Sequence, residues 1–361
     1  QSRVPAVDRA VTILDQVARD GRPLQLAELT RQVALPKSTV FAVCQALVAE
    51  RLLSRGVDGS YRLGPAVAEL AAARRQRGTA VQHIGMSVPN STNPFFDAEL
   101  AAARSEAQVA GAAFDQLAAD QDVAHQARDI VRLTGLGVEL LVVDPVASDG
   151  LEEALDHARE RGVTIVSVNG ATAGADATVV TDNAQAGALV ARHLAARLGG
   201  QGRVVIVGGA PVTAITDRIE GFRTALAESP GVDLVGIEPG DNSRAAGREA
   251  ARRFLASTPD VAGVFAINDL TALGVIDIVG TTSSPPKVVS VDGSAAAIAA
   301  IASGGPLIAT AAQEPDRLAR IAVRTGLNLA NGTAPAGRTL TLPTRLITAD
   351  DLASYQPWGL A

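Results

Sequence analysis

Polar and aromatic side chains follow a predicted buried strand near residue 90. The apolar run Ile84–Val88 ends at a polar loop, after which Asn93, Phe95 and Phe96 stand at the start of a predicted helix. Ligands of open α/β sheets bind beyond the carboxyl ends of the strands. Amides form paired hydrogen bonds with hydroxyl groups, and flat rings stack on apolar C–H faces. This run therefore predicts one wall of a cleft for a small molecule.

A second informative run, Leu35–Val40, reads as the turn and start of a DNA-recognition helix. Helical periodicity continues over Lys37–Leu52, where 100° per residue separates two faces. The inward face carries Val40, Val43, Cys44 and Leu47, and the outward face carries Ser38, Phe41, Ala42, Gln45 and Ala49. Cys44 on the inward face is expected to be a core residue. Together, the two runs indicate one chain that senses a ligand and holds DNA.

The elements around this helix predict a compact N-terminal domain. Two more helices are expected at Val7–Arg19 and Leu26–Val33, and a hairpin at Leu53–Arg55 and Ser60–Leu63. The dipeptide Asp58-Gly59 between the two hairpin runs is a strong turn signal. This order of elements predicts a winged helix-turn-helix over residues 1–64.

Three motifs of this domain, Val7–Leu14, Pro36–Val40 and Tyr61–Gly64, resemble the DNA-binding head of IclR-type regulators. The resemblance implies that the third helix enters the major groove. It places Lys37, Ser38 and Thr39 near phosphates, and Phe41, Ala42 and Gln45 near base edges. The family usually has an arginine where this chain has Ala42. The alternatives are that Ser38 and Thr39 merely cap the helix and that Gln45 is solvated.

Short apolar strands alternate with helical stretches through the rest of the chain, which predicts doubly wound parallel sheets. So many strands exceed what one sheet holds in this length, and a break near Thr181-Asp182-Asn183 divides them into two lobes with a cleft between. The predicted strands are Ile84–Val88, Ala112–Gln116, Glu139–Val143, Thr164–Val168, Arg203–Val207, Asp233–Ile237, Gly263–Ile267 and Lys287–Val291.

Four motifs in this region resemble ribose-type periplasmic sugar-binding proteins, whose fold also serves as the sensor of lac-repressor-like regulators. They are Asn93–Phe96, Val264–Gly274, Ser290–Gly293 and Ala312–Asp316. The resemblance implies a two-lobed α/β fold over residues 82–361. We expect lobe 1 to comprise 82–183 and 314–334, and lobe 2 to comprise 184–313 and 335–361. A linker helix is expected at 65–81, where Arg74, Arg75 and Arg77 lie near its end.

The same resemblance implies the ligand contacts. Asn93, Asn268, Asp292 and Gln313 are the expected polar contacts, and Phe95 and Phe96 the stacking rings. Further contacts are expected where the chain departs from ribose binders. Asp144 stands in place of an amide, and Asn169 and Gly170 stand in place of an Asp-Arg pair. Thr216 stands in place of a second arginine, and Asn242 stands in place of an aromatic wall. These changes predict a roomier, more acidic cleft that accepts a neutral sugar or sugar alcohol. The alternatives are that Asn268-Asp269 caps a helix and that Phe95-Phe96 is core.

Composition narrows the functional classes. Residues 1–78 carry 12 Lys+Arg against 7 Asp+Glu, whereas residues 79–361 carry 20 against 31, which suits DNA contact through the head alone. One cysteine, no long uncharged apolar stretch and no signal-peptide pattern favour a cytoplasmic protein without a membrane span. Phosphate-loop, nucleophile-elbow and metal-ligand patterns are missing, so we expect no enzyme, no metal and no cofactor.

The expected protein is a homodimeric regulator that binds operator DNA under the control of a sugar or polyol. A transport solute-binding protein is the main alternative, and a sugar-modifying enzyme a weaker one.

Overall fold

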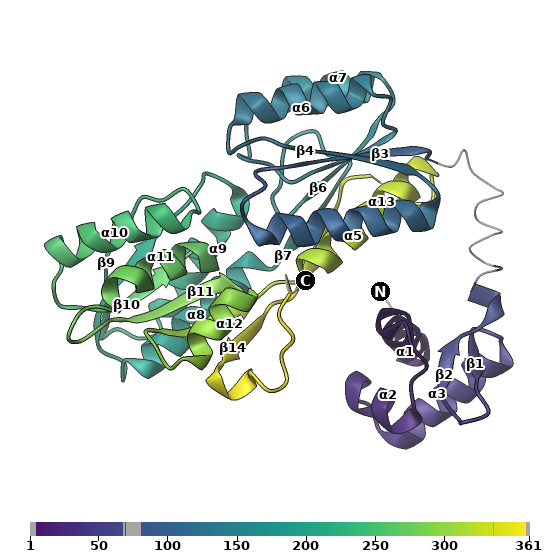
Figure 1. The fold of residues 1–361 in the computed structure, drawn as a ribbon, viewed down its shortest axis with the longest axis horizontal. Helices are drawn as coiled ribbons and strands as arrows, with labels where there is room; N and C mark the ends of the chain where they lie inside the picture. The colour runs from purple at the N-terminus through teal and green to yellow at the C-terminus, as the bar shows by residue number, and fades with distance from the viewer. Residues whose placement is uncertain (1–4, 68, 70–80, 335, 359–361) are drawn as a thin grey trace. The chain divides into compact units, whose positions relative to one another are not determined.

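The computed structural model describes residues 5–67, 69, 81–334 and 336–358 (Figure 1). The chain divides into two compact units, one up to Ala80 and one from Val81 onward, and each is described by itself. We refer to the first as the head and to the second as the body.

The head has the predicted winged helix-turn-helix order of elements. It consists of α1 (Pro5–Asp20), α2 (Leu26–Val33), α3 (Lys37–Ala49) and the antiparallel pair β1 (Leu53–Arg55) and β2 (Tyr61–Leu63). Its hydrophobic core consists only of its own residues, among them Ile13, Leu29, Val40, Cys44 and Tyr61, all at most 1% exposed. The head therefore has a core of its own.

The third helix ends earlier than predicted. It stops at Ala49 instead of Leu52, and Arg51 adopts a left-handed backbone conformation (φ 59°) that turns the chain into β1. The amide of Leu52 then donates to the carbonyl of Leu47. The predicted linker helix at 65–81, with Arg74, Arg75 and Arg77, lies largely outside the described residues.

Among the described residues, no single helix is long and apolar enough to cross a membrane. Only α2 and α3 taken together pass that test, across a bend of 112°.

Lobe 1 of the body is a parallel six-stranded sheet with the order β13-β7-β6-β5-β3-β4. Helices α5 and α13 cover one face, and α6 and α7 cover the other (Figure 1). The strands are β3 (His83–Val88), β4 (Ala113–Ala118), β5 (Leu140–Val143), β6 (Thr164–Val168), β7 (Ala177–Thr181) and β13 (Arg338–Leu342). The helices are α5 (Pro94–Ala110), α6 (Val123–Gly135), α7 (Glu152–Glu160) and α13 (Pro315–Ala330).

Lobe 2 repeats this architecture with the strand order β14-β12-β11-β10-β8-β9, in which only β14 is antiparallel to its neighbour. Helices α8 and α9 cover one face, and α10, α11 and α12 cover the other. The strands are β8 (Gly202–Val207), β9 (Val232–Glu238), β10 (Val261–Ala266), β11 (Lys287–Asp292), β12 (Leu307–Ala312) and β14 (Arg345–Thr348). The helices are α8 (Asn183–Arg197), α9 (Thr213–Leu226), α10 (Arg244–Ser257), α11 (Asp269–Val279), α12 (Ala295–Ala302) and the short η1 (Ala349–Asp351).

The chain passes between the lobes after β7, after β12 and between β13 and β14. This corrects the prediction that all of 335–361 belongs to lobe 2, because β13 pairs with β7 in the sheet of lobe 1. The side chain of Leu342 is buried in the core of lobe 1, and Ile347, five residues later, is buried in lobe 2. Since parallel strands end at one edge of each sheet, the strand ends of both lobes border one cleft.

Candidate functional site

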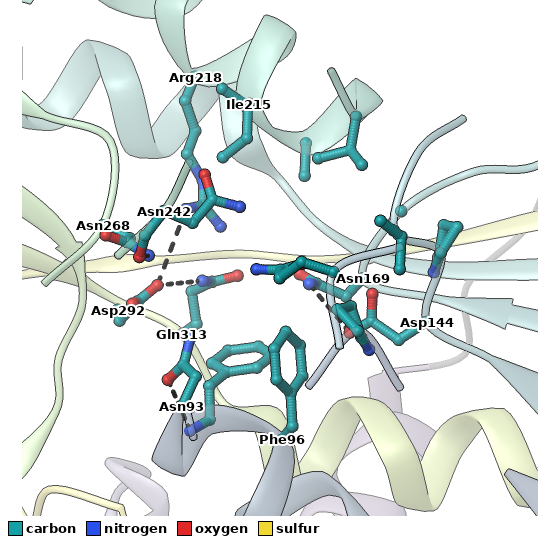
Figure 2. A pocket seen from close by; sticks show the side chains of 18 residues that line it. Asn93, Phe96, Asp144, Asn169, Ile215, Arg218, Asn242, Asn268, Asp292 and Gln313 are labelled. Atoms are coloured by element: carbon teal, nitrogen blue, oxygen red, sulfur yellow. Dashed lines mark hydrogen bonds and ion pairs between the residues drawn. The ribbon is translucent and has the colours of Figure 1, made fainter. Parts of the chain in front are cut away.

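A pocket lies between the two lobes at the carboxyl ends of their strands (Figure 2). Every residue predicted to contact a ligand lines it, except Thr216. The predicted residues that the structure brings together are Asn93, Phe95, Phe96, Asp144, Asn169, Asn242, Asn268, Asp292 and Gln313. Pro89, Gln121, Pro145, Val146, Gly170, Val212, Ala214, Ile215 and Arg218 complete the lining.

The first turn of α5 supplies the aromatic wall. The Asn93 side chain accepts a hydrogen bond from the amide of Phe95 at 3.0 Å, and Pro94 fixes the first helical position. The rings of Phe95 and Phe96 meet edge to face, with centroids 5.7 Å apart. Both rings belong to the core of lobe 1 and border the pocket as well, so the core alternative and the cleft-wall prediction are compatible.

Asn268 likewise combines two structural roles. Its Oδ1 accepts a hydrogen bond from the amide of Thr271 at 2.8 Å and caps α11, as the alternative reading had it. Its Nδ2 donates to the carbonyl of Asn242 at 3.0 Å, while Oδ1 of Asn242 accepts from the amide of Ala210. These contacts fix two amide groups at the wall formed by lobe 2.

Asp144 is the acidic group that lobe 1 contributes. Its Oδ2 accepts a hydrogen bond from Nδ2 of Asn169 at 3.2 Å (Figure 2). Burial raises the pKa of Asp144 to about 7, and burial together with the Asp144 charge raises the pKa of the neighbouring Glu99 well above its usual range. A proton is therefore held readily at this end of the pocket.

Arg218 is the main correction to the sequence prediction. The sequence places Thr216 where ribose binders have an arginine and predicts no cation in the cleft, but Arg218 lines the pocket two residues later. Helix α9 begins at Thr213, so Ile215 and Arg218 share its inward face, whereas Thr216 is exposed. The 3.6-residue period of α9 contained this signal, because Arg218 follows the apolar Ile215 by three positions.

The Arg218 guanidinium is held in place by lobe 2. Its Nε donates to Oδ1 of Asn183 and its Nη1 donates to the carbonyl of Ile267, both at 2.8 Å. The same Nη1 lies 3.7 Å from Oδ1 of Asp292 (Figure 2). Burial lowers the pKa of Arg218, while the charge of Asp292 opposes that shift. Among the described residues that line the pocket, Arg218 is the one cation, and it is already paired.

Asp292 faces Arg218 from the end of β11. Its Oδ1 accepts a hydrogen bond from Nε2 of Gln313 at 2.7 Å. Burial, followed by the charge of Asp269, raises the pKa of Asp292 to about 7. Its backbone lies at φ 140°, a conformation that L residues rarely adopt, and Gln121, Asn169 and Asn242 around the same pocket also have positive φ. Such backbone conformations persist only where surrounding contacts hold them, and they are common at functional sites.

The ring of Pro145 lies close to Gly170. A Cβ atom built on Gly170 would lie 2.9 Å from Cγ of Pro145, so the proline ring crowds the place where a longer side chain would begin. The Pro145 ring thus takes part of the space expected there, and the roomier cleft stays a prediction. Sequence patterns gave no signal for Pro145 or Gln121, which reach the pocket from loops.

Direct hydrogen bonds join the lobes at the mouth of the pocket. The Thr213 amide donates to Oγ of Ser148 and its Oγ1 accepts from the amide of Ala171, both at 3.0 Å. The amide of Ser148 donates to the carbonyl of Pro211 at 3.4 Å. We call Ser148, Ala171, Pro211 and Thr213 the latch. The cleft is therefore closed in this structure.

Five of the six predicted DNA-contacting residues of α3 are exposed. Lys37, Ser38, Phe41, Ala42 and Gln45 are exposed, with Phe41 43% exposed, and Thr39 is partly buried. The N-cap of α3 is Pro36, so neither Ser38 nor Thr39 caps the helix as the alternative held.

Cys44 lies on the opposite face of α3 and is buried. Burial raises the pKa of its thiol to about 11. This agrees with its predicted place in the core, because a buried, protonated thiol reacts slowly.

Comparison with known proteins gives two matching family models. A periplasmic binding protein domain matches residues 84–334, and an IclR helix-turn-helix domain matches residues 6–56. The ribose import binding protein of Bacillus subtilis is 29% identical over 268 residues, which is 73% of this chain and 87% of that protein.

Solved structures with similar folds include sugar- and polyol-bound proteins. An ABC transporter solute-binding protein from Mycobacterium smegmatis with bound glycerol is 30% identical, with a TM-score of 0.72, over 76% of this chain and 96% of that one. A Caulobacter myo-inositol-binding protein with bound myo-inositol is 25% identical, with a TM-score of 0.70, over 76% and 96% of the two chains.

Proposed function

This chain belongs to the periplasmic binding protein domain family and carries an IclR helix-turn-helix domain, and from that premise we propose that it is a transcriptional regulator controlled by a sugar. The head binds operator DNA, and a neutral sugar or sugar alcohol in the pocket of the body alters that binding. As a DNA-binding protein it acts in the cytoplasm, without catalysis, cofactor or metal.

One observation supports this proposal most directly: a pocket and an exposed third helix of the helix-turn-helix domain occur in the same chain. Polar strand-end residues of both lobes meet in a closed cleft, whereas α3 presents Lys37, Phe41 and Gln45 to solvent. A face with phosphate-binding and base-reading side chains has no use in carrying a solute to a transporter. The pairing favours regulation over transport.

The ligand class follows from the charges of the pocket. Arg218 is already paired with Asp292 and bonded to Asn183 and Ile267, so it supplies no free cation for a phosphate or carboxylate. The carboxyl oxygens of Asp144 and Asp292 can instead accept hydrogen bonds from sugar hydroxyls. The amide groups of Asn93, Asn268 and Gln313 also suit hydrogen bonds with hydroxyls. We therefore expect neutral sugars to bind and sugar phosphates to be rejected.

The proposed regulation uses closure of the cleft as its two-state element. A ligand that contacts both lobes stabilises the closed form by its difference in affinity for the two forms. In a homodimer, that closure changes the spacing of the two heads and hence their fit to an operator with two-fold symmetry.

A solute-binding protein of a sugar transporter remains the second candidate. It is favoured by the names of the relatives, but these match only the body. A sugar-modifying enzyme is a weaker candidate, since neither matching family model describes an enzyme.

Two measurements on the full chain test the proposal. Selection from random DNA should enrich a site with two-fold symmetry, and fluorescence anisotropy should then show that one sugar changes the affinity for that site. A thermal-shift screen against D-ribose, myo-inositol and ribose 5-phosphate identifies that sugar, because a hundredfold excess over the Kd stabilises the fold by about 2.7 kcal/mol. A chain that binds a sugar but no DNA would favour the transport alternative.

A further inference from the structure

The C-terminal segment from Ser354 to Trp358, which we call the strap, returns from η1 to the place where the two lobes meet (Figure 1). Its last described residue, Trp358, is only partly exposed and packs against the core of lobe 1. No pattern in the sequence singled out this segment.

The strap holds the end of β11 in lobe 2. The Trp358 indole Nε1 donates to the carbonyl of Asp292 at 2.9 Å, and the hydroxyl of Tyr355 donates to the carbonyl of Gly293 at 2.8 Å. Residues Ser294 and Trp358 also form a parallel bridge. These bonds fall on the two residues with φ of 140° and 80°, so the strap stabilises the strained turn that aims the Asp292 carboxyl into the pocket.

The same indole also contacts lobe 1. The rings of Trp358 and Phe95 meet edge to face at 88°, with centroids 5.5 Å apart. Phe95 and Asp292 line the ligand pocket from opposite lobes. A rotation that opens the cleft separates these two residues, and one rigid indole ring then keeps only one of its two contacts.

We infer that Trp358 is a positioning residue of the ligand pocket, which couples the orientation of Asp292 in lobe 2 to that of Phe95 in lobe 1. Its two contacts are made together only in the closed cleft, so Trp358 favours closure and strengthens sugar binding without touching the sugar. The identity of the ligand as a sugar rests on the proposed function, but the coupling between the lobes does not rest on it.

Hydrogen exchange of the full chain without sugar tests the coupling. Trp358→Phe keeps the ring next to Phe95 and loses the N–H donor, whereas Trp358→Leu loses both contacts. We expect Trp358→Leu to speed exchange at the start of α5 and around residues 292–297, and Trp358→Phe to do so mainly around 292–297. Ile347→Val, a buried change in β14 of the same tail, serves as the control and should alter neither region. Faster exchange in only one lobe for Trp358→Leu would overturn the inference.

Sugar binding provides the second arm. In calorimetric titrations with D-ribose and myo-inositol, Trp358→Phe should weaken the binding of whichever sugar binds by roughly three- to tenfold, as expected for the loss of one hydrogen bond. Ile347→Val should bind as the unchanged chain does, and equal affinity in Trp358→Phe would overturn the inference.

A spectroscopic signature separates positioning from a general loss of stability. Trp358 is the single tryptophan of the chain, so 5-fluorotryptophan gives one ¹⁹F resonance, which should shift when the sugar binds. If neither sugar binds, the proposed ligand class fails, and the exchange arm still decides the role of Trp358.

Discussion

At the scale of single residues, the pocket depends on one buried cation among several acids. Arg218 is 4% exposed and lies close to Asp292, while Asp269 and Asp144 act on it electrostatically. A buried pair is costly to form, but removing one partner leaves the other uncompensated. Arg218 therefore determines both the fold of lobe 2 at this point and the charge that a ligand meets.

Replacing Arg218 with Met should destabilise the chain strongly. We expect a loss of about 3–5 kcal/mol at pH 8, where Asp292 is mostly ionised, and a smaller loss at pH 5, where Asp292 is protonated. Urea unfolding at both pH values measures this. Arg223→Met, an exposed change on the same helix, is the control. Equal losses for the two variants would show that the Arg218 charge does not matter.

The raised pKa values of Asp144 and Asp292, about 7 each, predict how stability depends on pH. Both pKa values lie above that of an unfolded aspartate, near 3.9, so the folded state binds more protons between these values. The free energy of unfolding without sugar should therefore fall as pH rises from about 4 to 7.

The affinity for sugar should show the opposite trend. Sugar hydroxyls donate hydrogen bonds to the ionised acids, so the affinity of the chain for the sugar should rise over pH 6–8. Thermal melts and sugar titrations at several pH values test both trends. Both stability and affinity should depend less on pH in Asp292→Asn than in the unchanged chain.

The sequence predicted much of the site at this scale. The resemblance pointed to Asn93, Asn268 and Asp292. Asp292 ends β11, and Asn93 and Asn268 cap the helices that follow β3 and β10, so the strand ends bring the three together. Arg218 was missed because the resemblance assigned the arginine position to Thr216, whereas the helical turn of α9 brings Arg218 inward. Trp358 reaches Asp292 from 66 positions away, a contact that no local pattern encodes.

At the scale of elements, the latch and the strap join the lobes at different places. Each latch bond joins one lobe to the other, so the latch stabilises the closed cleft as a sugar does.

Four strands were not predicted from the sequence. They are β7, β12, β13 and β14, and they lie where the chain passes between the lobes. Edge strands such as Arg338–Leu342 alternate polar and apolar residues and lack the continuous apolar run of a central strand.

Weakening the latch should shorten the lifetime of the closed complex. Thr213→Val removes the Oγ1 acceptor of the Ala171 amide with little change in volume. We expect a sugar to dissociate several-fold faster, measured by stopped-flow tryptophan fluorescence, with little change in association. Thr216→Val on the same helix lies outside the pocket and should behave as the unchanged chain. Identical dissociation in both variants would mean that the latch does not hold the cleft.

The exposed face of α3 predicts two distinct effects on DNA binding. Gln45→Ala should relax base preference, because the proposed DNA complex places this exposed residue at a base edge. Lys37→Gln should weaken binding nearly equally on all sequences and lower the salt slope by about one unit. Anisotropy titrations at several salt concentrations separate the two. Normal operator affinity in both variants would exclude α3 as the reading element.

At the scale of the whole molecule, charge is divided unequally along the chain. Residues 1–78 have an excess of Lys+Arg and the rest of the chain has an excess of Asp+Glu, as expected if the head alone contacts phosphates. A single winged head contacts few phosphates, so two linked heads are needed for useful affinity at physiological salt.

We therefore expect the chain to bind operator DNA as a dimer. Sedimentation velocity at micromolar concentration should give twice the chain mass of 36.8 kDa, and the complex should contain two chains per operator. Tight operator binding by a species that sediments as a monomer would contradict the proposed assembly.

The separate core of the head has a practical consequence. The core residues of the head pack only among other residues of the head, so the head does not need a particular body sequence to fold. These core residues include Ile13, Leu29, Val40, Cys44 and Tyr61. Natural recombination can exchange such a module without repacking either partner. The same property makes the body a candidate for engineered biosensors: grafted onto a head with a known operator, it should place a reporter gene under the control of its own sugar.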